Sequence, residues 1–395
     1  MKGQNVRVTS LDLTFLNLPL VRPERWTWGE RSSYTVGLVE LHTDVGITGL
    51  GEVNVCMGPD TTVITALTQQ LAGMVIGESP LAPQRLISRV MAEGWYPFHR
   101  TASLVLGGIE MSCWDAMGKF LKQPISTFFG GALRQSFASM YYVQRYEDIN
   151  NMVEIGKDAV GRGFNTIYFK VGTEEQRDLE LVRRMREGIG PSPHIRVDAN
   201  EAWSPGTAVR ILRSMAPFGI EYIEQPVSMF DIDGMAHVRR ASGVAVGANQ
   251  TSWGPHATLE VVRKEAADVI MTDPHQEGGL LPFKRVLGLC EMAGLPFVVH
   301  AFNATSLSLI ADLQVLSTST APLLAQQGHP DFLADDYVTK PLDYADGLLQ
   351  VPQLPGIGVD IDKEKLVKYH NRFEEEGMAS IYSADSSASQ VIPAI

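Results

Sequence analysis

Residues 165–200 read NTIYFKVGTEEQRDLELVRRMREGIGPSPHIRVDAN, and this stretch decides the fold class. It begins and ends with short runs rich in β-branched and aromatic residues, which favour strands. Between them, apolar residues recur at helical spacing and the segment ends near glycine, as crossover helices do. A strand, a helix and a second strand in this order predict a βαβ unit with parallel strands.

The same unit recurs from about residue 136 onward, so that the chain contains eight strand-like runs separated by amphipathic segments. Eight parallel strands with helical crossovers are what a closed (β/α)8 barrel, the TIM-barrel architecture, requires. A doubly wound open sheet is the alternative. However, no GxGxxG motif opens a helix after the first strand, and eight short strands are many for one open sheet. The runs are SMYYV, NTIYFKV, HIRVDA, EYIEQ, VAVGA, DVIMTD, PFVVHA and PLLAQ.

The chain before the barrel is organised differently and predicts a small α+β domain. Strand-like runs come first, with a tight turn at Asp44 and Gly46, and helical segments follow, the longest at residues 102–121. After Pro355 the chain becomes polar, with one helix expected near residues 362–376. We therefore expect an α+β capping domain at residues 1–132, the barrel at residues 133–355, and a C-terminal segment at residues 356–395 that packs back on the capping domain.

Composition narrows the classes of function. With 395 residues, of which 45% are hydrophobic and 20% charged, the chain is long enough for two globular domains. No apolar stretch reaches the roughly 20 residues of a membrane helix, and the N-terminus has no signal-peptide core, so we expect a cytoplasmic protein. A formal charge of −12 disfavours nucleic-acid binding. Cys56, Cys113 and Cys290 lack CxxC spacing and predict buried thiols.

Polar residues end the predicted barrel strands in phase with the repeat. In a barrel of this kind the active site lies at the C-terminal ends of the strands, so side chains that recur once per unit should converge on one mouth. Successive members of the series are 28, 26, 26, 23, 27 and 26 residues apart. The series is Lys170, Asp198, Glu224, Gln250, Asp273, His300 and Gln326.

Two carboxylates of this series, Asp198 and Glu224, end neighbouring strands, and carboxylates held that close favour a cation between them. Oxygen donors suit Mg²⁺, and Gln250 would supply an amide oxygen as the third ligand. The alternative is that each carboxylate caps a helix or pairs with an arginine. Two carboxylates in phase, in the contexts DAN and EQP, favour the metal site.

Candidate acid/base groups lie on both sides of these carboxylates. A metal bound by the substrate carboxylate would acidify the neighbouring C–H bond, and Lys170 would remove that proton if burial and the metal lower its pKa. On the opposite side of the barrel, Asp273 would hold His300 in one tautomer and support its charged form. The alternatives are a surface lysine and a buried histidine whose ring is bonded to the backbone.

With these residues the chain resembles the enolase superfamily, and within it the mandelate racemase-like subgroup, over nearly its whole length. The matching motifs are YFK at a Lys-x-Lys position, DAN, EQP and ANQ at the metal-ligand positions, and TDPHQEGG and VVHAF at the positions of an Asp/His dyad. The segments GIEMSCWDAMGK and FFGGALR also look like the family. The resemblance implies a modified (β/α)7β barrel with an N-terminal capping domain, Mg²⁺ as cofactor, and abstraction of the proton next to a carboxylate.

Three positions depart from the family pattern. Tyr168 stands where the first lysine is expected, which removes a cation and makes Tyr168 a candidate hydrogen-bond donor or acid/base group. Gln250 replaces an acidic ligand, which leaves the metal more electrophilic and more weakly held. Ala325 stands where a strand-eight glutamate assists the substrate carboxylate, and Gln326 or Gln327 is the candidate to replace it. Together these changes disfavour a mandelate racemase in the strict sense.

The segment VRPERWTWGERSSY, residues 21–34, is the counterpart of a loop that covers the site in relatives. Its arginines would contact a polyhydroxy or dicarboxylic substrate, and its tryptophans would exclude water. A solvated loop is the alternative. The candidates for substrate binding are Arg22, Arg25, Arg31, Trp26, Trp28, Asn200, Asn303 and Gln326.

The polar loop favours a sugar acid as substrate. We therefore expect an aldonate or aldarate dehydratase, which is a carbon–oxygen lyase whose enolate intermediate loses a β-hydroxyl group. Reprotonation on the other face, by a racemase or epimerase of a 2-hydroxy acid or an amino acid derivative, is the first alternative. A catalytically silent barrel used for binding is the second. The expected partners are a small carboxylate substrate and further copies of the chain, from dimer to octamer, with no nucleic acid and no membrane.

Overall fold

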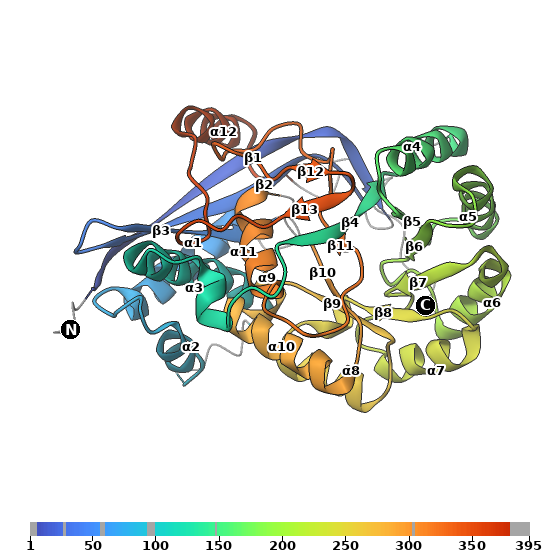
Figure 1. The fold of residues 1–395 in the computed structure, drawn as a ribbon, viewed down its shortest axis with the longest axis horizontal. Helices are drawn as coiled ribbons and strands as arrows, with labels where there is room; N and C mark the ends of the chain where they lie inside the picture. Colours follow the sequence, from blue (N-terminus) through green and yellow to red (C-terminus); the bar gives the residue numbers. More distant parts are fainter. Residues whose placement is uncertain are drawn as a thin grey trace.

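The first part of the fold is a three-stranded antiparallel sheet, in the order β1-β2-β3, with three helices (Figure 1). The computed structural model describes residues 6–26, 29–55, 60–92, 99–146, 148–301 and 305–379. No helix in these ranges has both the length and the apolar character that crossing a membrane requires. The elements are β1 (Val8–Trp26), β2 (Gly29–Thr43), β3 (Thr48–Asn54), α1 (Thr61–Val75), α2 (Pro83–Ala92) and α3 (His99–Leu121).

Strands β1 and β2 continue through most of the segment that was expected to be a loop. Their register places Glu24 opposite Arg31 and Arg25 opposite Glu30. Opposite charges across a hairpin stabilise such a pairing. The expectation of a loop at residues 21–34 was therefore wrong. Charged cross-strand pairs hold the two strands together here, and the strands consequently lack the alternating apolar residues by which a strand is recognised in a sequence.

The second part is a closed barrel. Strands β4 to β10 pair in parallel in chain order, and β11 pairs in parallel with β4. The ring closes where Phe297 of β10 donates to the carbonyl of Pro322 and accepts from the backbone N–H of Leu324. This closure confirms the barrel and excludes the open sheet. The strands are β4 (Ser136–Val143), β5 (Thr166–Lys170), β6 (His194–Asp198), β7 (Ile220–Glu224), β8 (Val246–Ala248), β9 (Val269–Thr272), β10 (Phe297–Val299) and β11 (Gln326–Gln327).

Helices on the outside connect consecutive strands (Figure 1). Several begin at side chains that accept a hydrogen bond from the first turn, such as Asp148 before α4 and Ser204 before α6. The described chain continues from β11 into a hairpin instead of a crossover helix, which is the (β/α)7β form. The helices are α4 (Ile149–Gly161), α5 (Glu175–Ile189), α6 (Pro205–Met215), α7 (Ile232–Ser242), α8 (Pro255–Arg263), α9 (Pro274–Glu277), α10 (Leu280–Ala293) and α11 (Ser306–Leu316), with short 3-10 turns η2 (Ile125–Phe129), η3 (Ala216–Phe218) and η4 (Gln250–Ser252).

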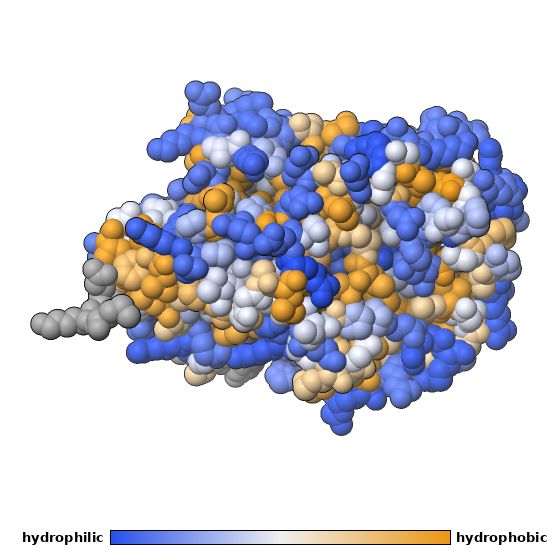
Figure 2. Space-filling model, viewed as in Figure 1, coloured by the Kyte–Doolittle hydropathy of each residue, from blue (hydrophilic) through white to orange (hydrophobic). Residues whose placement is uncertain are grey.

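After β11 the chain turns back over β4 and then over β1. The hairpin of β12 (Tyr344–Ala345) and β13 (Leu348–Gln350) pairs antiparallel with β4. Helix α12 (Lys363–Glu376) then lies along β1, where the rings of Phe373 and Phe15 are 5.2 Å apart. Figure 2 shows the outer surface of α12, at the upper left, as hydrophilic. One apolar face therefore attaches this helix to the sheet.

Strand β3 packs directly on α3, and two glycines make the close approach possible. A Cβ atom at Gly49 would lie 2.0 Å from the carbonyl oxygen of Ser112, and one at Gly51 would lie 2.0 Å from that of Gly108. One apolar core lies between this sheet and helices α1 to α3. A larger core fills the barrel and extends to Leu16, Leu18 and Tyr34 of β1 and β2, so the capping domain and barrel share buried surface.

The carboxylate of Glu110 joins the two domains. This residue lies on α3, is fully buried, and accepts hydrogen bonds from the backbone N–H groups of Leu280 (2.6 Å) and Leu281 (3.1 Å) at the start of α10. It also accepts from the indole of Trp114 at 2.6 Å. Burial raises the pKa of Glu110 to about 7, although these bonds oppose the shift. A capping-domain side chain thus caps a barrel helix.

Replacement of Glu110 with alanine should destabilise the protein by about 3 kcal/mol, because it leaves buried donors without an acceptor. Glu110→Gln is the matched control, since its amide oxygen retains one acceptor, and it should cost less than the alanine variant. Urea unfolding followed by tryptophan fluorescence measures both. Equal unfolding midpoints for wild type, Glu110→Gln and Glu110→Ala would show that this contact contributes nothing to stability.

Candidate active site

Three members of the polar series lie side by side at the ends of adjacent parallel strands. The register pairs Lys170 of β5 with Asp198 of β6, and Asp198 with Glu224 of β7. The ammonium nitrogen of Lys170 is 2.5 Å from Oδ2 of Asp198, and the hydroxyl of Tyr168 donates to the same oxygen at 2.8 Å. Lys170 and Tyr168 are themselves 3.1 Å apart, because residues two apart on a strand share a face.

Glu224 and Gln250 complete a set of oxygen donors. Asp198 and Glu224 are 0% and 1% exposed. Burial and the charge of Asp198 raise the pKa of Glu224 well above its usual range, which shows how poorly two such carboxylates tolerate each other without compensation. Gln250 begins η4, and its Oε1 atom is buried with no hydrogen-bond partner among the described residues. Two crowded carboxylates and an unsatisfied amide oxygen fit a hard divalent cation such as Mg²⁺.

In the described part of the chain, no three His, Cys, Asp or Glu side chains gather into a metal site. A cation beside Asp198 and Glu224 would therefore take its third protein donor from an amide. Nearby Asn249 is turned away, because its side-chain amide donates to the backbone oxygen of Met271 and to Gln276, both at 3.4 Å. The side-chain oxygen of Gln250, in contrast, makes no hydrogen bond with the described residues.

Asp273 and His300 meet at the ends of β9 and β10. The Nδ1 atom of His300 is 3.0 Å from Oδ2 of Asp273. The other oxygen of Asp273 accepts the backbone N–H groups of His275 (2.8 Å) and Gln276 (3.0 Å). Burial alone would raise the pKa of Asp273, but the hydrogen bonds from His275 and His300 lower it. A charged carboxylate is therefore fixed behind the imidazole of His300.

Several residues near these groups were not anticipated. Glu24 on β1 is 7% exposed and forms a buried ion pair with Arg31, and its charge acts on Lys170 from the capping domain. Tyr142, the register partner of Tyr168, lies with its ring centroid 5.9 Å from the Lys170 nitrogen. A sequence signal for Tyr142 existed, since it lies near the end of the first barrel strand at the position that Tyr168 occupies on the second. Glu24 carried no comparable signal, because only docking of the hairpin brings it here.

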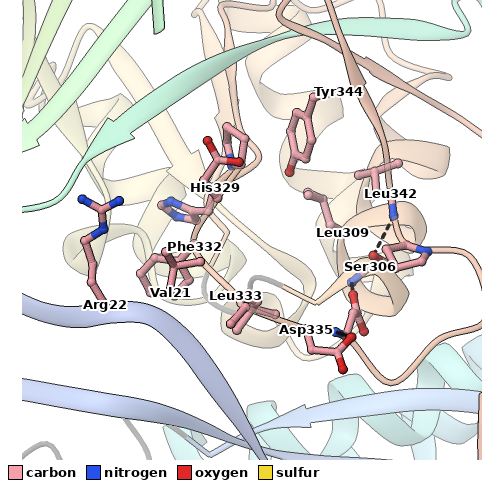
Figure 3. A pocket seen from close by; sticks show the side chains of 15 residues that line it. Val21, Arg22, Ser306, Leu309, His329, Phe332, Leu333, Asp335, Leu342 and Tyr344 are labelled. Atoms are coloured by element: carbon pink, nitrogen blue, oxygen red, sulfur yellow. Dashed lines mark hydrogen bonds between the residues drawn. The ribbon is translucent and has the colours of Figure 1, made fainter. Parts of the chain in front are cut away.

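His329 packs against Tyr142 and is influenced by the charges of both acid/base groups. Its ring centroid is 5.4 Å from that of Tyr142. Burial and the charges of His300 and Lys170 lower the pKa of His329 to about 3, so its ring is neutral. Figure 3 shows His329 and Phe332 on the loop after β11, facing Arg22 of β1 across the edge of a cavity of about 570 Å³. The charges of both Lys170 and His300 therefore act on this one ring.

Gln326 and Gln327 have different parts in the structure. Gln326 uses both ends of its amide on the backbone, since it accepts from Val299 at 2.6 Å and donates to Leu324 at 2.5 Å. The role in substrate binding expected of Gln326 does not fit this arrangement. Gln327 instead accepts from the backbone of Ala301 at 3.0 Å, and its amide nitrogen is 3.4 Å from Oε2 of Glu224. Gln327 is the strand-eight residue that faces the carboxylates.

The other substrate-binding candidates are spread more widely. Asn200 is buried and its backbone N–H donates to Asp198 at 2.7 Å, so it supports that carboxylate. Arg31 is held by the buried Glu24. Arg22 and Arg25 lie on the outer part of the hairpin. Trp28 and Asn303 lie outside the described residues, and only the backbone of Trp26 is described.

Arg25 belongs to a recess lined by arginines. Among the described residues, a cavity of about 250 Å³ is lined by Arg25, Arg145, Tyr146 and Arg177. An adjoining hollow of about 420 Å³ adds Arg22. Burial lowers the pKa of Arg145, and the positive charges of Arg177 and Arg25 act in the same direction, although Asp178 opposes them. Like charges gathered from β1, from the loop after β4 and from α5 favour an anionic ligand.

Comparison with known proteins agrees with this architecture. The family model described as "Mandelate racemase / muconate lactonizing enzyme, N-terminal domain" matches residues 12–130, and "Enolase C-terminal domain-like" matches residues 151–365. The chain is 27% identical to N-succinyl-L-Arg/Lys racemase of Bacillus cereus over 368 residues, which cover 91% of this chain and 97% of that protein. It is 26% identical to arabinonate dehydratase of Saccharolobus solfataricus over 327 residues, which cover 82% and 87%.

A solved structure shows the same fold over nearly the whole chain. The crystal structure of an enolase described as a putative sugar isomerase, from Streptomyces coelicolor, superimposes with a TM-score of 0.86 at 27% identity, covering 94% of this chain and 99% of that one. The two family models together cover the capping domain and the barrel, and the structural similarity extends over both. The chain therefore belongs to the enolase superfamily, in the group of mandelate racemase and muconate lactonizing enzyme.

Proposed function

We propose that this protein removes the proton next to the carboxylate of a sugar acid and then eliminates the β-hydroxyl group, which makes it an acid sugar dehydratase. The observation that carries the proposal is that two independent acid/base groups, Lys170 and the pair of Asp273 and His300, lie at the ends of parallel strands of the same barrel that also presents a set of oxygen donors. A divalent cation held by Asp198, Glu224 and Gln250 would stabilise the negative charge of the enolate.

Lys170 is the proposed base. Burial opposes its charge, but the carboxylates of Asp198 and Glu224, together with the hydrogen bond to Asp198, raise the pKa of Lys170. A cation bound to those carboxylates would compensate their charges and so favour the neutral amine of Lys170. The neutral amine then accepts the α-proton at Nζ. Burial and the same two carboxylates raise the pKa of Tyr168 well above its usual range. Tyr168 therefore stays protonated, and we assign it the role of a hydrogen-bond donor that positions Asp198 and Lys170.

His300 is the proposed acid. Because Nδ1 faces the carboxylate of Asp273, that nitrogen keeps its hydrogen and Nε2 is the reacting atom. The charged ring donates its Nε2 proton to the departing β-hydroxyl group, which leaves as water while the electron pair of the enolate forms the new double bond. The resulting enol gives the keto acid, and His300 returns to its neutral form.

The arginine recess favours a substrate with a second anionic group. Arg145 follows the first barrel strand, Arg177 lies on the helix after the strand that Lys170 ends, and Arg25 reaches the same recess from the capping domain. An aldarate would place its distal carboxylate among these guanidinium groups, whereas an aldonate carries a neutral alcohol there. The similarity to arabinonate dehydratase supports a sugar acid as the substrate class.

A racemase or epimerase is the second candidate. Lys170 and His300 come from strands on different sides of the barrel, so one could remove a proton and the other return it on the opposite face. The similarity to N-succinyl-L-Arg/Lys racemase favours this possibility. The two reactions differ in product, because dehydration yields a keto acid and racemisation does not.

A screen of aldonic and aldaric acids with Mg²⁺ tests the proposal. Formation of a product that reacts with semicarbazide, and that is lost in both Lys170→Ala and His300→Asn, would establish the dehydratase and identify its substrate. Incorporation of solvent deuterium without that product would establish the racemase or epimerase instead. Neither signal with any acid of the panel would contradict the assignment to sugar acids.

The arginine recess makes a separate prediction. Arg145→Gln should raise KM for an aldarate by about 10- to 100-fold with little change in kcat, because a charge-assisted contact to the distal carboxylate is worth about 1.5–3 kcal/mol. The matched control is Arg183→Gln, which removes an arginine bound to Glu180 and Glu187 on the exposed side of α5. Steady-state kinetics on the aldarate and the corresponding aldonate decide the matter. An equal effect on both substrates would exclude a role for Arg145 in recognising the distal group.

A further inference from the structure

A second imidazole contacts the carboxylate that supports His300. His275 on α9 is 1% exposed, and its Nδ1 atom lies 3.6 Å from Oδ1 of Asp273. The other oxygen, Oδ2, faces Nδ1 of His300 at 3.0 Å. Asp273 therefore lies between two histidines, with one carboxylate oxygen directed at each ring.

The capping domain determines the hydrogen positions on the second ring. The Nε2 atom of His275 is 2.9 Å from the backbone carbonyl oxygen of Glu52 on β3. A carbonyl oxygen only accepts, so Nε2 carries a hydrogen. Nδ1 lies within ion-pair distance of Oδ1 of Asp273, although beyond hydrogen-bond distance, so a second hydrogen on Nδ1 places a positive ring beside the carboxylate. The geometry therefore favours the positively charged imidazolium form of His275.

The charged groups around His275 come from three elements. Asp273 precedes α9, Glu52 lies on β3, and Asp312 lies on α11. Burial opposes a charge on the ring, but the nearby carboxylate of Asp273, with smaller contributions from Asp312 and Glu52, outweighs it and raises the pKa of His275 to about 9. Burial raises the pKa of Glu52 despite hydrogen bonds from Ser308, Tyr337 and Thr305. Asp273, whose pKa is lowered, is therefore the main counter-charge of the ring.

Backbone packing holds this arrangement in place. Helix α3 crosses α9 at Gly107, where an added Cβ would lie 3.3 Å from the Cα of His275 and 3.1 Å from the oxygen of Pro274. The backbone N–H of His275 also donates to Asp273. The ring, its main chain and its carboxylate partner thus have little room to move relative to one another.

We propose that His275 is a positioning residue for the reaction, whose buried imidazolium shares Asp273 with His300 and so weakens the attraction between Asp273 and a protonated His300. The consequence is that His300 gives up its proton more readily to the leaving group. This inference rests on the proposed function only for the identity of the proton acceptor. The sharing of Asp273 is a property of the protein in the absence of turnover.

The first test reads the protonation state of His275 in the wild-type protein. The nine histidines of the full-length chain are labelled with ¹⁵N in the rings, and spectra are recorded at pH 7 with Mg²⁺ present. The signal lost in His275→Gln identifies His275, and the one lost in His300→Asn identifies His300. Two protonated nitrogens on His275 are expected. A neutral ring with one protonated nitrogen in the wild-type protein would overturn the proposal.

The second test measures the coupling. His275→Gln retains an amide N–H for the carbonyl of Glu52 but removes the charge, so the pH midpoint of the His300 titration should move upward by about one unit, as for one neighbouring charge. His256→Gln, on exposed α8, is the control and should leave the midpoint unchanged. An unchanged His300 midpoint in folded His275→Gln would overturn the proposal. Because the titration requires no substrate, this result is independent of whether the enzyme is a dehydratase.

Discussion

Replacement of Lys170 with methionine should lower kcat/KM by about a thousandfold or more, because the enzyme then has no group at Nζ to accept the α-proton, and a positioned base contributes about 10²–10⁴-fold. Methionine preserves the length of the side chain but carries no charge and no N–H group. The Nζ atom is bound to Asp198 at 2.5 Å and to Tyr168 at 3.1 Å, so the substitution removes a cation and two hydrogen bonds from the site.

Two measurements keep this result interpretable. Circular dichroism must show that Lys170→Met is folded, and stabilisation by Mg²⁺ should persist, since the variant retains Asp198, Glu224 and Gln250. Exchange of the substrate α-hydrogen with deuterium should disappear together with product formation. Activity within tenfold of wild type would exclude Lys170 as the base and direct attention to His300.

Replacement of Glu224 with glutamine should have opposite effects on stability with and without metal. In the metal-free protein, burial and Asp198 raise the pKa of Glu224, so its charge is costly and a neutral amide should leave stability equal or higher. With Mg²⁺ at 100 times its Kd, wild type should gain about 2.7 kcal/mol of stability, and the variant should gain almost none. Thermal unfolding across a Mg²⁺ titration measures both effects.

Glu180→Gln is the control for this experiment, because Glu180 lies on α5 with its side chain 41% exposed and paired with Arg183. It should respond to Mg²⁺ as wild type does. A Glu224→Gln variant that is still stabilised by Mg²⁺ to the wild-type extent would place the cation elsewhere. Loss of stability in the metal-free variant would show that the carboxylate is already compensated within the protein.

The barrel and the positions of the polar side chains were predictable, because both follow from periodicity. Parallel strands of similar length end at one mouth, so residues spaced by one βα unit meet there regardless of the loops between them. Lys170, Asp198 and Glu224 occupy adjacent register positions for this reason. The pairing of Asp273 with His300 follows in the same way from β9 and β10.

Periodicity did not predict which side chain of the eighth strand faces the site. PLLAQ was expected to be the strand, but the chain pairs with β10 through residues 322–324 and with β4 through Gln326 and Gln327. A strand of two residues has no alternation to read, and a shift of one position exchanges the side chain that faces the site for the one that does not. Only the tertiary structure therefore shows that Gln327, and not Gln326, faces the carboxylates.

The sequence by itself determined the closed barrel, the family and the side chains at the strand ends, because these depend on repeating local patterns that survive without knowledge of docking. The tertiary structure alone decided which capping-domain groups meet the barrel. Glu24 acts on Lys170, Glu110 caps α10, and the carbonyl of Glu52 holds His275. Each of these contacts joins residues far apart in the chain, and the physical reason is that packing between two preformed surfaces has no period that a sequence displays.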